Sequence, residues 1–181
     1  WITEGFEDFR KGTFGNSGQN LYISRAGVLQ RIYQHDLRHD GFFPLVFANC
    51  QNHHESAESY VYDEEGRRTE LPGQGALCGL VADLTGNGWN DIVVGGYYDM
   101  AAPYASTDIY FGSPEGYSQK NHIRIPTPWA EDCCCGHFDG SGKPCLAFAL
   151  TKYKIIRVFF QTELGFEWKR YQDFSIEANS I

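Results

Sequence analysis

Short apolar stretches alternate with polar, glycine-containing loops along this chain. In LVADLTGNGWNDIVVGG (80–96), for example, two apolar segments flank a loop of Asp, Asn and Gly. Alternation of apolar and polar residues, bounded by such loops, is typical of β-strands. No apolar stripe with a period of 3.6 residues is long enough to predict a helix. The pattern therefore predicts strands throughout.

Three segments of the chain share this order of strand, loop and strand. They are YQHDLRHDGFFPLVFAN (33–49), LVADLTGNGWNDIVVGG (80–96) and CCGHFDGSGKPCLAFAL (134–150). Alignment on Asp36, Asp83 and His137 gives two steps of roughly 50 residues, a period typical of the blades of β-propellers.

Two further strands follow each of these segments. Third strands with a Gly turn fit YVYDEEG (60–66), IYFGSPEG (109–116) and VFFQTELG (158–165), whose aromatics Tyr62, Phe111 and Phe160 are equally spaced along the chain. Fourth strands fit RRTEL (67–71), SQKNHIRI (118–125) and FEWKRYQDF (166–174). Four strands per unit predict an all-β fold, a β-propeller built of four-stranded antiparallel blades. A β-sandwich would not explain the repeated loop.

The units divide the chain into an incomplete arc of about three blades plus a partial one, all in one propeller domain. We expect a partial blade at 1–32, because NLYISRAGVLQRI (20–32) resembles only the end of a unit, and blades at 33–79, 80–132 and 133–181. An open arc leaves two blade faces uncovered. We therefore expect further blades, from the same polypeptide or from a partner chain, and a chain that begins inside a blade.

DLTGNGWNDIVVGG followed by DIYFGSPEGY resembles an FG-GAP/VCBS-like repeat. In that family an Asp-rich calcium loop joins the first two strands, and a Phe-Gly turn precedes the last. The resemblance covers nearly all of the chain and is clearest in the second unit. Similar repeats occur in integrin α-chain heads and in many secreted and cell-surface proteins, where they mediate adhesion or ligand binding. The resemblance thus implies an extracellular or cell-surface binding or scaffolding module.

The loop of the second unit predicts one calcium site. Calcium prefers oxygen ligands at alternating positions of a tight loop in which Gly permits the turn. The oxygens come from Asp83, Thr85, Asn87, the backbone carbonyl of Trp89, and Asp91. The alternative is that Asp83 and Asn87 cap the turn through hydrogen bonds to its backbone.

The other two loops predict turns without a metal ion. In DLRHDGFFP, Asp36 and Asp40 are in register, but Arg38 and Pro44 occupy ligand positions. In HFDGSGKPC, His137 and Cys145 stand at the first and last positions, and only Asp139 and Ser141 keep oxygen. Imidazole and thiol are poor calcium ligands. A soft-metal site at His137 and Cys145 is the less favoured alternative.

The connections after the second strands are the candidate ligand surface, since binding often resides in variable loops on a rigid scaffold. In the resembled fold they lie opposite the calcium loops. Aromatic rings beside amides and carboxylates suit a sugar ring or a peptide, so we expect a glycan or protein ligand; the alternative is an ordinary solvated loop. The candidate residues are Asn52, His53, His54, Tyr97, Tyr98, Asp99 and Tyr104.

Composition and motifs exclude several other functions. The formal charge is −8 and no Lys/Arg run occurs, so nucleic acid is not an expected partner. No apolar stretch approaches the roughly 20 residues of a membrane-spanning helix, so we expect no membrane insertion. The six cysteines, including the run at 133–135, lack CxxC spacing and read as small buried residues of strands, with Cys134 pointing away from its two neighbours.

Catalysis is not expected either. The chain contains no GxSxG, GxGxxG, phosphate-loop or HExxH motif. Its scattered carboxylates do not identify a glycosidase pair. Because propellers of this type also occur in polysaccharide lyases, an accessory or catalytic domain of a glycan-active enzyme is the alternative function.

Overall fold

The structure is a computed structural model. It describes residues 9–11, 21–24, 28–34, 45–51, 59–62, 67–97 and 105–176. Side chains are described for residues 59–61, 67–97 and 105–176. The described residues form antiparallel strands and one 3-10 turn, so the all-β class is confirmed. None of their segments is a helix long and apolar enough to cross a membrane.

The first sheet, sheet A, contains six strands in chain order. They are β1 (Phe9–Lys11), β2 (Leu21–Ser24), β3 (Val28–Gln34), β4 (Leu45–Gln51), β5 (Ser59–Tyr62) and β6 (Arg68–Leu71). The expected boundary between residues 32 and 33 lies inside β3. Because β2 pairs with β3 as a hairpin, the expected partial blade and first blade share one continuous sheet.

Sheets B and C each contain four antiparallel strands in chain order, as expected. Sheet B comprises β7 (Ala76–Ala82), β8 (Asp91–Gly96), β9 (Thr107–Tyr110) and β10 (His122–Ile125). Sheet C comprises β11 (Ala130–Gly136), β12 (Cys145–Leu150), β13 (Ile155–Thr162) and β14 (Gly165–Ser175), with the 3-10 turn η2 (Thr151–Tyr153) after β12. The expected boundaries at 79/80 and 132/133 therefore lie inside β7 and β11.

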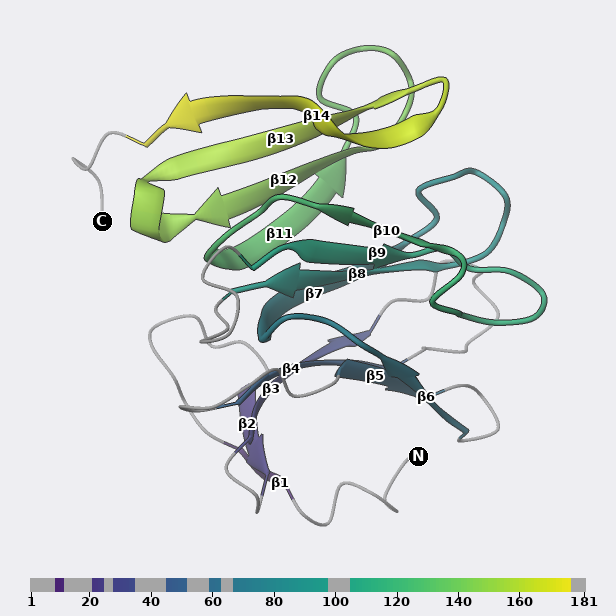
Figure 1. The fold of residues 1–181 in the computed structure, drawn as a ribbon, viewed down its shortest axis with the longest axis vertical. Helices are drawn as coiled ribbons and strands as arrows, with labels where there is room; N and C mark the ends of the chain where they lie inside the picture. The colour runs from purple at the N-terminus through teal and green to yellow at the C-terminus, as the bar shows by residue number, and fades with distance from the viewer. Residues whose placement is uncertain are drawn as a thin grey trace.

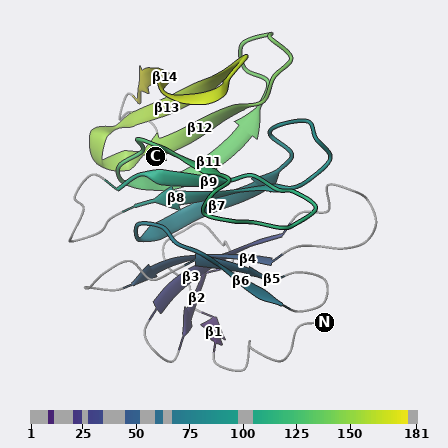
Figure 2. The same cartoon turned by 45° about the vertical axis from the view of Figure 1, so that its right-hand side comes forward.

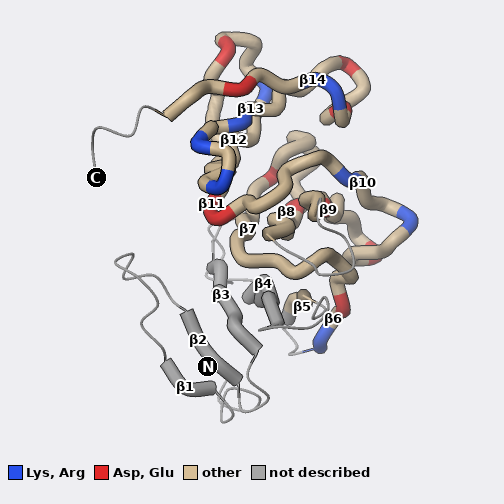
Figure 3. The backbone as a smooth tube through the Cα atoms, turned by 60° about the vertical axis from the view of Figure 1, so that its left-hand side comes forward, with Lys and Arg blue, Asp and Glu red and all other residues tan. Residues whose placement is uncertain are grey.

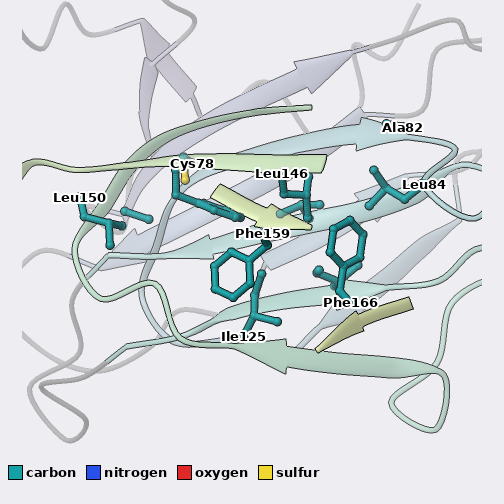
Figure 4. Packing of buried hydrophobic residues seen from close by; sticks show 12 residues of the cluster. Cys78, Ala82, Leu84, Ile125, Leu146, Leu150, Phe159 and Phe166 are labelled. Atoms are coloured by element: carbon teal, nitrogen blue, oxygen red, sulfur yellow. The ribbon is translucent and has the colours of Figure 1, made fainter. Parts of the chain in front are cut away.

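The three sheets stack face to face, with sheet B in the middle (Figures 1 and 2). The face of sheet B that bears Ile92, Val94 and Tyr110 packs on Val61 and Leu71 of sheet A. Its opposite face packs on sheet C, in a cluster of aliphatic and aromatic side chains (Figure 4). Sheet B is thus covered on both faces, which accounts for the largely apolar sequences of β7 and β8.

Sheets B and C repeat each other strand by strand. Val81 pairs with Ile92 as Cys135 pairs with Leu146, at the step that the sequence predicts for the loops. Thr107 pairs with Ile125 as Ile156 pairs with Phe174, at the step predicted for the third strands. The internal repeat is therefore present in the register of the strands.

The cysteines follow the predicted alternation but only in part the predicted burial. Cys133 packs in the cluster between sheets B and C, whereas Cys134 lies opposite Ala147 on the other face. Cys78 and Cys145 are buried, as expected. The prediction was wrong for Cys134 and Cys135, which are exposed free thiols. Cys134 is exposed because no described strand covers the outer face of sheet C (Figure 1).

Candidate functional site

The loop between β7 and β8 is closed by the carboxylate of Asp83. Oδ1 accepts hydrogen bonds from the N–H groups of Gly86 (2.7 Å) and Asn87 (3.2 Å), and Oδ2 accepts one from Gly88 (2.8 Å). Gly86 and Gly88 have φ angles of 73° and 83°, a region that favours glycine. The positions predicted for calcium ligands thus form a tight turn around the Asp83 carboxylate, which accepts these hydrogen bonds.

Asp91, the last predicted ligand, joins this loop to the Phe-Gly turn. Its Oδ2 accepts the N–H of Leu84 and its Oδ1 the N–H of Gly112, each at 2.8 Å. The side chain is wholly buried. Burial raises the pKa of the Asp91 carboxyl to about 6, although the two backbone hydrogen bonds and that of Thr85 oppose the shift. A Cβ on Gly112 would lie 2.2 Å from the carbonyl oxygen of Asn90, so only glycine fits there.

These contacts leave few oxygens for a calcium ion. Asp83 already accepts three N–H groups, Asp91 accepts two, and Asn87 Oδ1 accepts the N–H of Trp89 at 2.8 Å. A carboxylate offers about four lone-pair sites, and calcium takes six to eight oxygen ligands. The buried Oδ1 of Asn90, which lies outside the predicted set, lacks a hydrogen-bond partner. The donor set therefore fits calcium poorly as it stands, and the alternative role of turn capping has geometric support.

The loop between β11 and β12 has the same backbone shape. Gly140 and Gly142 have φ angles of 73° and 79°, and Ser141 Oγ accepts the N–H of Lys143 as Asn87 accepts that of Trp89. In the part of the chain that the structure describes, no group of three His, Cys, Asp or Glu side chains could hold a metal ion. The loop of the first unit, with Asp36 and Asp40, lies outside the described residues.

Gln161, which sequence reasoning missed, connects the two loops. Its Nε2 donates to the carbonyl oxygens of Leu84 (2.8 Å) and Pro144 (2.9 Å). By the spacing of the third strands, Gln161 is the equivalent of Gly112, so sheet C has an amide side chain where sheet B has glycine. This contact fixes one loop against the other at this end of the sheets.

An aromatic and cationic cluster lies at the opposite end of sheets B and C. Tyr97 follows β8, Trp129 precedes β11, and Lys152 lies in η2 after β12. The rings of Tyr97 and Trp129 meet edge to face, with centroids 5.2 Å apart. Lys152 Nζ stands 3.8 Å from the centroid of the Trp129 ring, a cation–π contact. We call these three residues the Trp129 cluster.

Trp129 is held in a strained conformation. Its φ angle is 64°, in the left-handed region that bulky residues seldom adopt and that costs about 1–3 kcal/mol. Its N–H donates to the carbonyl oxygen of Tyr97 at 2.9 Å, which fixes the turn. Such strain often marks functional sites. Next to the cluster, the side chain of Tyr153 is 45% exposed.

An ion pair between the buried Asp108 and the half-exposed Arg124 lies in sheet B near the same end. The Asp108 side chain is wholly buried and lies 2.9 Å from Arg124 Nε and 3.6 Å from His122 Nε2. Burial raises the pKa of the Asp108 carboxyl, and the Arg124 hydrogen bond and charge oppose that effect. The contacts of Asp108 thus join side chains of β9 and β10.

Of the residues predicted for the ligand surface, the structure describes Tyr97 alone. Asn52, His53, His54, Tyr98, Asp99 and Tyr104 lie outside the described residues. Sequence reasoning missed Trp129 and Lys152. The signal that could have found Lys152 was the short connection 151–153, equivalent to the longer loops of the other units.

In the comparisons with known proteins, no family model and no curated protein matches the chain.

Proposed function

We propose that this chain is a non-catalytic module that binds a glycan through the end of the sheets that carries the Trp129 cluster. The proposal includes a propeller-like arrangement of the three sheets and a place in an extracellular or cell-surface protein. The resemblance of DLTGNGWNDIVVGG to FG-GAP/VCBS-like repeats supports both. The regular stacking of sheets A, B and C supports the first (Figure 2).

The strained Trp129 is the observation that carries the binding proposal. A core aromatic is normally placed on a strand or helix, whereas this ring lies in a turn at a φ angle that glycine would adopt more readily. The Trp129 ring is half-buried, and the Lys152 ammonium, with three hydrogen-bond donors, stands over one face of it, so a ligand would meet aromatic surface and donors side by side. A sugar needs both, because its ring stacks on aromatic faces and its hydroxyls or carboxylates accept hydrogen bonds.

The electrostatics of this end are mixed. Lys152 and Lys154 lie around η2, close to the acidic start of β11 (Figure 3). Arg157 is paired with Asp173 at 2.7 Å and donates to the carbonyl oxygen of Pro126 at 2.9 Å, so its charge is used within the fold. Lys152 in η2 and Lys154 just after it are thus the cations placed to meet a ligand.

Calcium at residues 83–91 remains a separate hypothesis. Its support is the Asp, Thr, Asn and Asp spacing of the loop. The hydrogen bonds of Asp83 and Asp91 give the loop a way to close without an ion. The binding proposal does not depend on this site, because the Trp129 cluster lies at the other end of β8.

A glycan array with the purified chain tests the proposed function, and Trp129→Gly is the decisive variant. Glycine suits the left-handed turn, so the variant should retain the fold while losing the ring. We expect binding to one glycan class by wild type, loss of that binding in Trp129→Gly, and no sugar products. Tyr171→Phe, a conservative change on β14, is the control and should bind as wild type does.

Three results would contradict the proposed site, the absence of catalysis or the ligand class. Equal binding by wild type and Trp129→Gly would place the ligand elsewhere. Unsaturated sugar products would support the polysaccharide lyase alternative. Binding to proteins but to no glycan would mean that the ligand class is wrong.

A further inference from the structure

Two cysteines meet across the interface between sheets B and C. Cys78 lies on β7 and is wholly buried in the cluster that joins the two sheets (Figure 4), and Cys133 of β11 packs against that cluster. The two side chains are free thiols that share a hydrogen bond. The interface therefore contains a pair of sulfur atoms in direct contact.

The first strands of the two sheets approach each other closely. Cα atoms of β7 lie within 8 Å of Cα atoms of β11, whereas sheets that pack face to face are typically about 10 Å apart. Small side chains permit this approach, because Ala82 on β7 and Ala130 on β11 are buried in the same cluster as Cys78. A disulfide needs Cα atoms about 4.4–6.8 Å apart, so strands as close as these suit one.

Glycine at position 95 makes room for the Cys78 sulfur. Gly95 is the register partner of Cys78 on β8. A Cβ on Gly95 would lie 2.1 Å from Cys78 Sγ, so the sulfur occupies the space that a side chain of residue 95 would fill. The Cys78 thiol thus has a fixed position in the interface, which a sulfur–sulfur bond to the facing strand requires.

The other described cysteines are placed differently. Cys134 and Cys135, which follow on β11, are exposed. Cys145 is buried at the start of β12, where its Sγ donates to a backbone carbonyl oxygen at 3.8 Å. Among the described cysteines, the contact across the interface therefore selects Cys78 and Cys133 as a pair.

We propose that Cys78 and Cys133 form a disulfide bond that links sheet B to sheet C when the chain meets a small disulfide oxidant such as glutathione disulfide. The bond closes a loop that contains β8, β9 and β10. A crosslink across a long loop stabilises a fold by restricting the unfolded chain. An extracellular setting, which is proposed above on separate grounds, is oxidising and favours such a bond.

The bond forms by two thiol–disulfide exchanges. The thiolate of Cys133 attacks one sulfur of glutathione disulfide, which gives a mixed disulfide and releases one glutathione thiolate. The thiolate of Cys78 then attacks the Cys133 sulfur and releases the second. The chain loses two electrons and two protons, and glutathione disulfide becomes two thiols. The hydrogen bond with Cys78 and burial raise the pKa of the Cys133 thiol, so its thiolate is scarce and the exchange is slow at neutral pH.

Peptide mapping of the folded chain tests the pair directly. The chain is incubated with glutathione disulfide at mildly alkaline pH, its remaining thiols are alkylated with iodoacetamide in urea, and it is digested without reductant. We expect two peptides linked through Cys78 and Cys133, and fragment spectra that show Cys134 and Cys135 alkylated or joined to glutathione. Any other partner for Cys78, or a free Cys78 thiol, would overturn the proposal.

Thermal unfolding measures what the crosslink contributes. Reduction of oxidised wild type with dithiothreitol should lower its melting temperature by about 5–10 °C. Cys133→Ala should show no such drop, whereas Cys145→Ala, the matched control that removes another buried thiol, should retain it. No drop in wild type, or an equal drop in Cys133→Ala, would contradict the crosslink. Neither result bears on glycan binding, which has its own assay.

Discussion

Asp91→Asn is expected to change how the stability of the chain depends on pH. The Asp91 pKa is about 6 in the folded chain, against an ordinary value of 3.8. The folded chain therefore holds this proton more tightly than the unfolded chain does. Its stabilising effect is fully present below the unfolded pKa and is lost as pH rises through the folded pKa.

The size of the effect follows from the two pKa values. A difference of this size corresponds to about 3 kcal/mol of unfolding free energy, lost between about pH 4 and pH 7. Asparagine does not ionise, so Asp91→Asn lacks this loss. It has one carbonyl oxygen for the two N–H groups of Leu84 and Gly112, which costs about 1–3 kcal/mol for an unsatisfied buried donor.

Urea unfolding followed by tryptophan fluorescence at a series of pH values measures the two contributions. We expect the free energy of unfolding of the variant to be lower than that of wild type near pH 4. By pH 7 the variant should have gained about 3 kcal/mol relative to wild type. The Asp108 carboxyl, whose pKa is also raised, is present in both proteins and cancels in the comparison. A constant difference between the two proteins across this range would refute the reasoning.

Asp139→Asn is the matched control in the equivalent loop of sheet C. Hydrogen bonds from Ser141 lower the pKa of the exposed Asp139 carboxyl. The sign is therefore opposite: its contribution is present above the unfolded pKa and is lost as pH falls. The free energy of unfolding of wild type should therefore rise relative to that of this variant as pH rises through the acidic range.

Two further predictions concern the β9–β10 turn and the β7–β8 loop of sheet B. Gly112→Ala should lower the free energy of unfolding by about 3 kcal/mol, because its Cβ meets a backbone oxygen. Gly116→Ala, at a φ of 85° with open space around it, should lower it by about 1 kcal/mol. Equal losses of unfolding free energy in the two variants, measured by urea unfolding, would contradict the close packing around Gly112. If calcium binds at residues 83–91, millimolar calcium should raise the melting temperature of wild type but not of Asp83→Ala; equal shifts in both, or no shift in wild type, would leave Asp83 as a turn cap alone.

The repeat was predictable from the sequence because the loops keep glycine at matching positions, where the backbone needs it. Gly86 and Gly140 adopt the same φ angle, and the spacing of their loops reappears in the strand register. The continuous sheet A was missed, because the β2–β3 hairpin adds strands ahead of the first loop, where the repeat has no counterpart.

The candidate site was less predictable. Trp129 precedes β11 as Gly75 precedes β7, and Gly75 also has a positive φ, of 47°. The sequence hides this position of the repeat, because a tryptophan stands where the preceding unit has glycine. Lys152 reaches the Trp129 ring from another strand end, a contact that depends on how sheets B and C stack. The exposure of Cys134 likewise depends on which sheet lies last in the stack.

The most direct test of the binding proposal is a titration of the tryptophan indole N–H signals in a ¹H–¹⁵N spectrum, using the glycan selected by the array. Trp89 lies in the loop at the other end of sheet B, and Trp168 lies on β14 with 61% of its side chain exposed, so both serve as internal controls. We predict that the Trp129 signal shifts and saturates with the glycan while those of Trp89 and Trp168 stay in place. A saturable shift of Trp89 or Trp168 with Trp129 unmoved would contradict the proposed site.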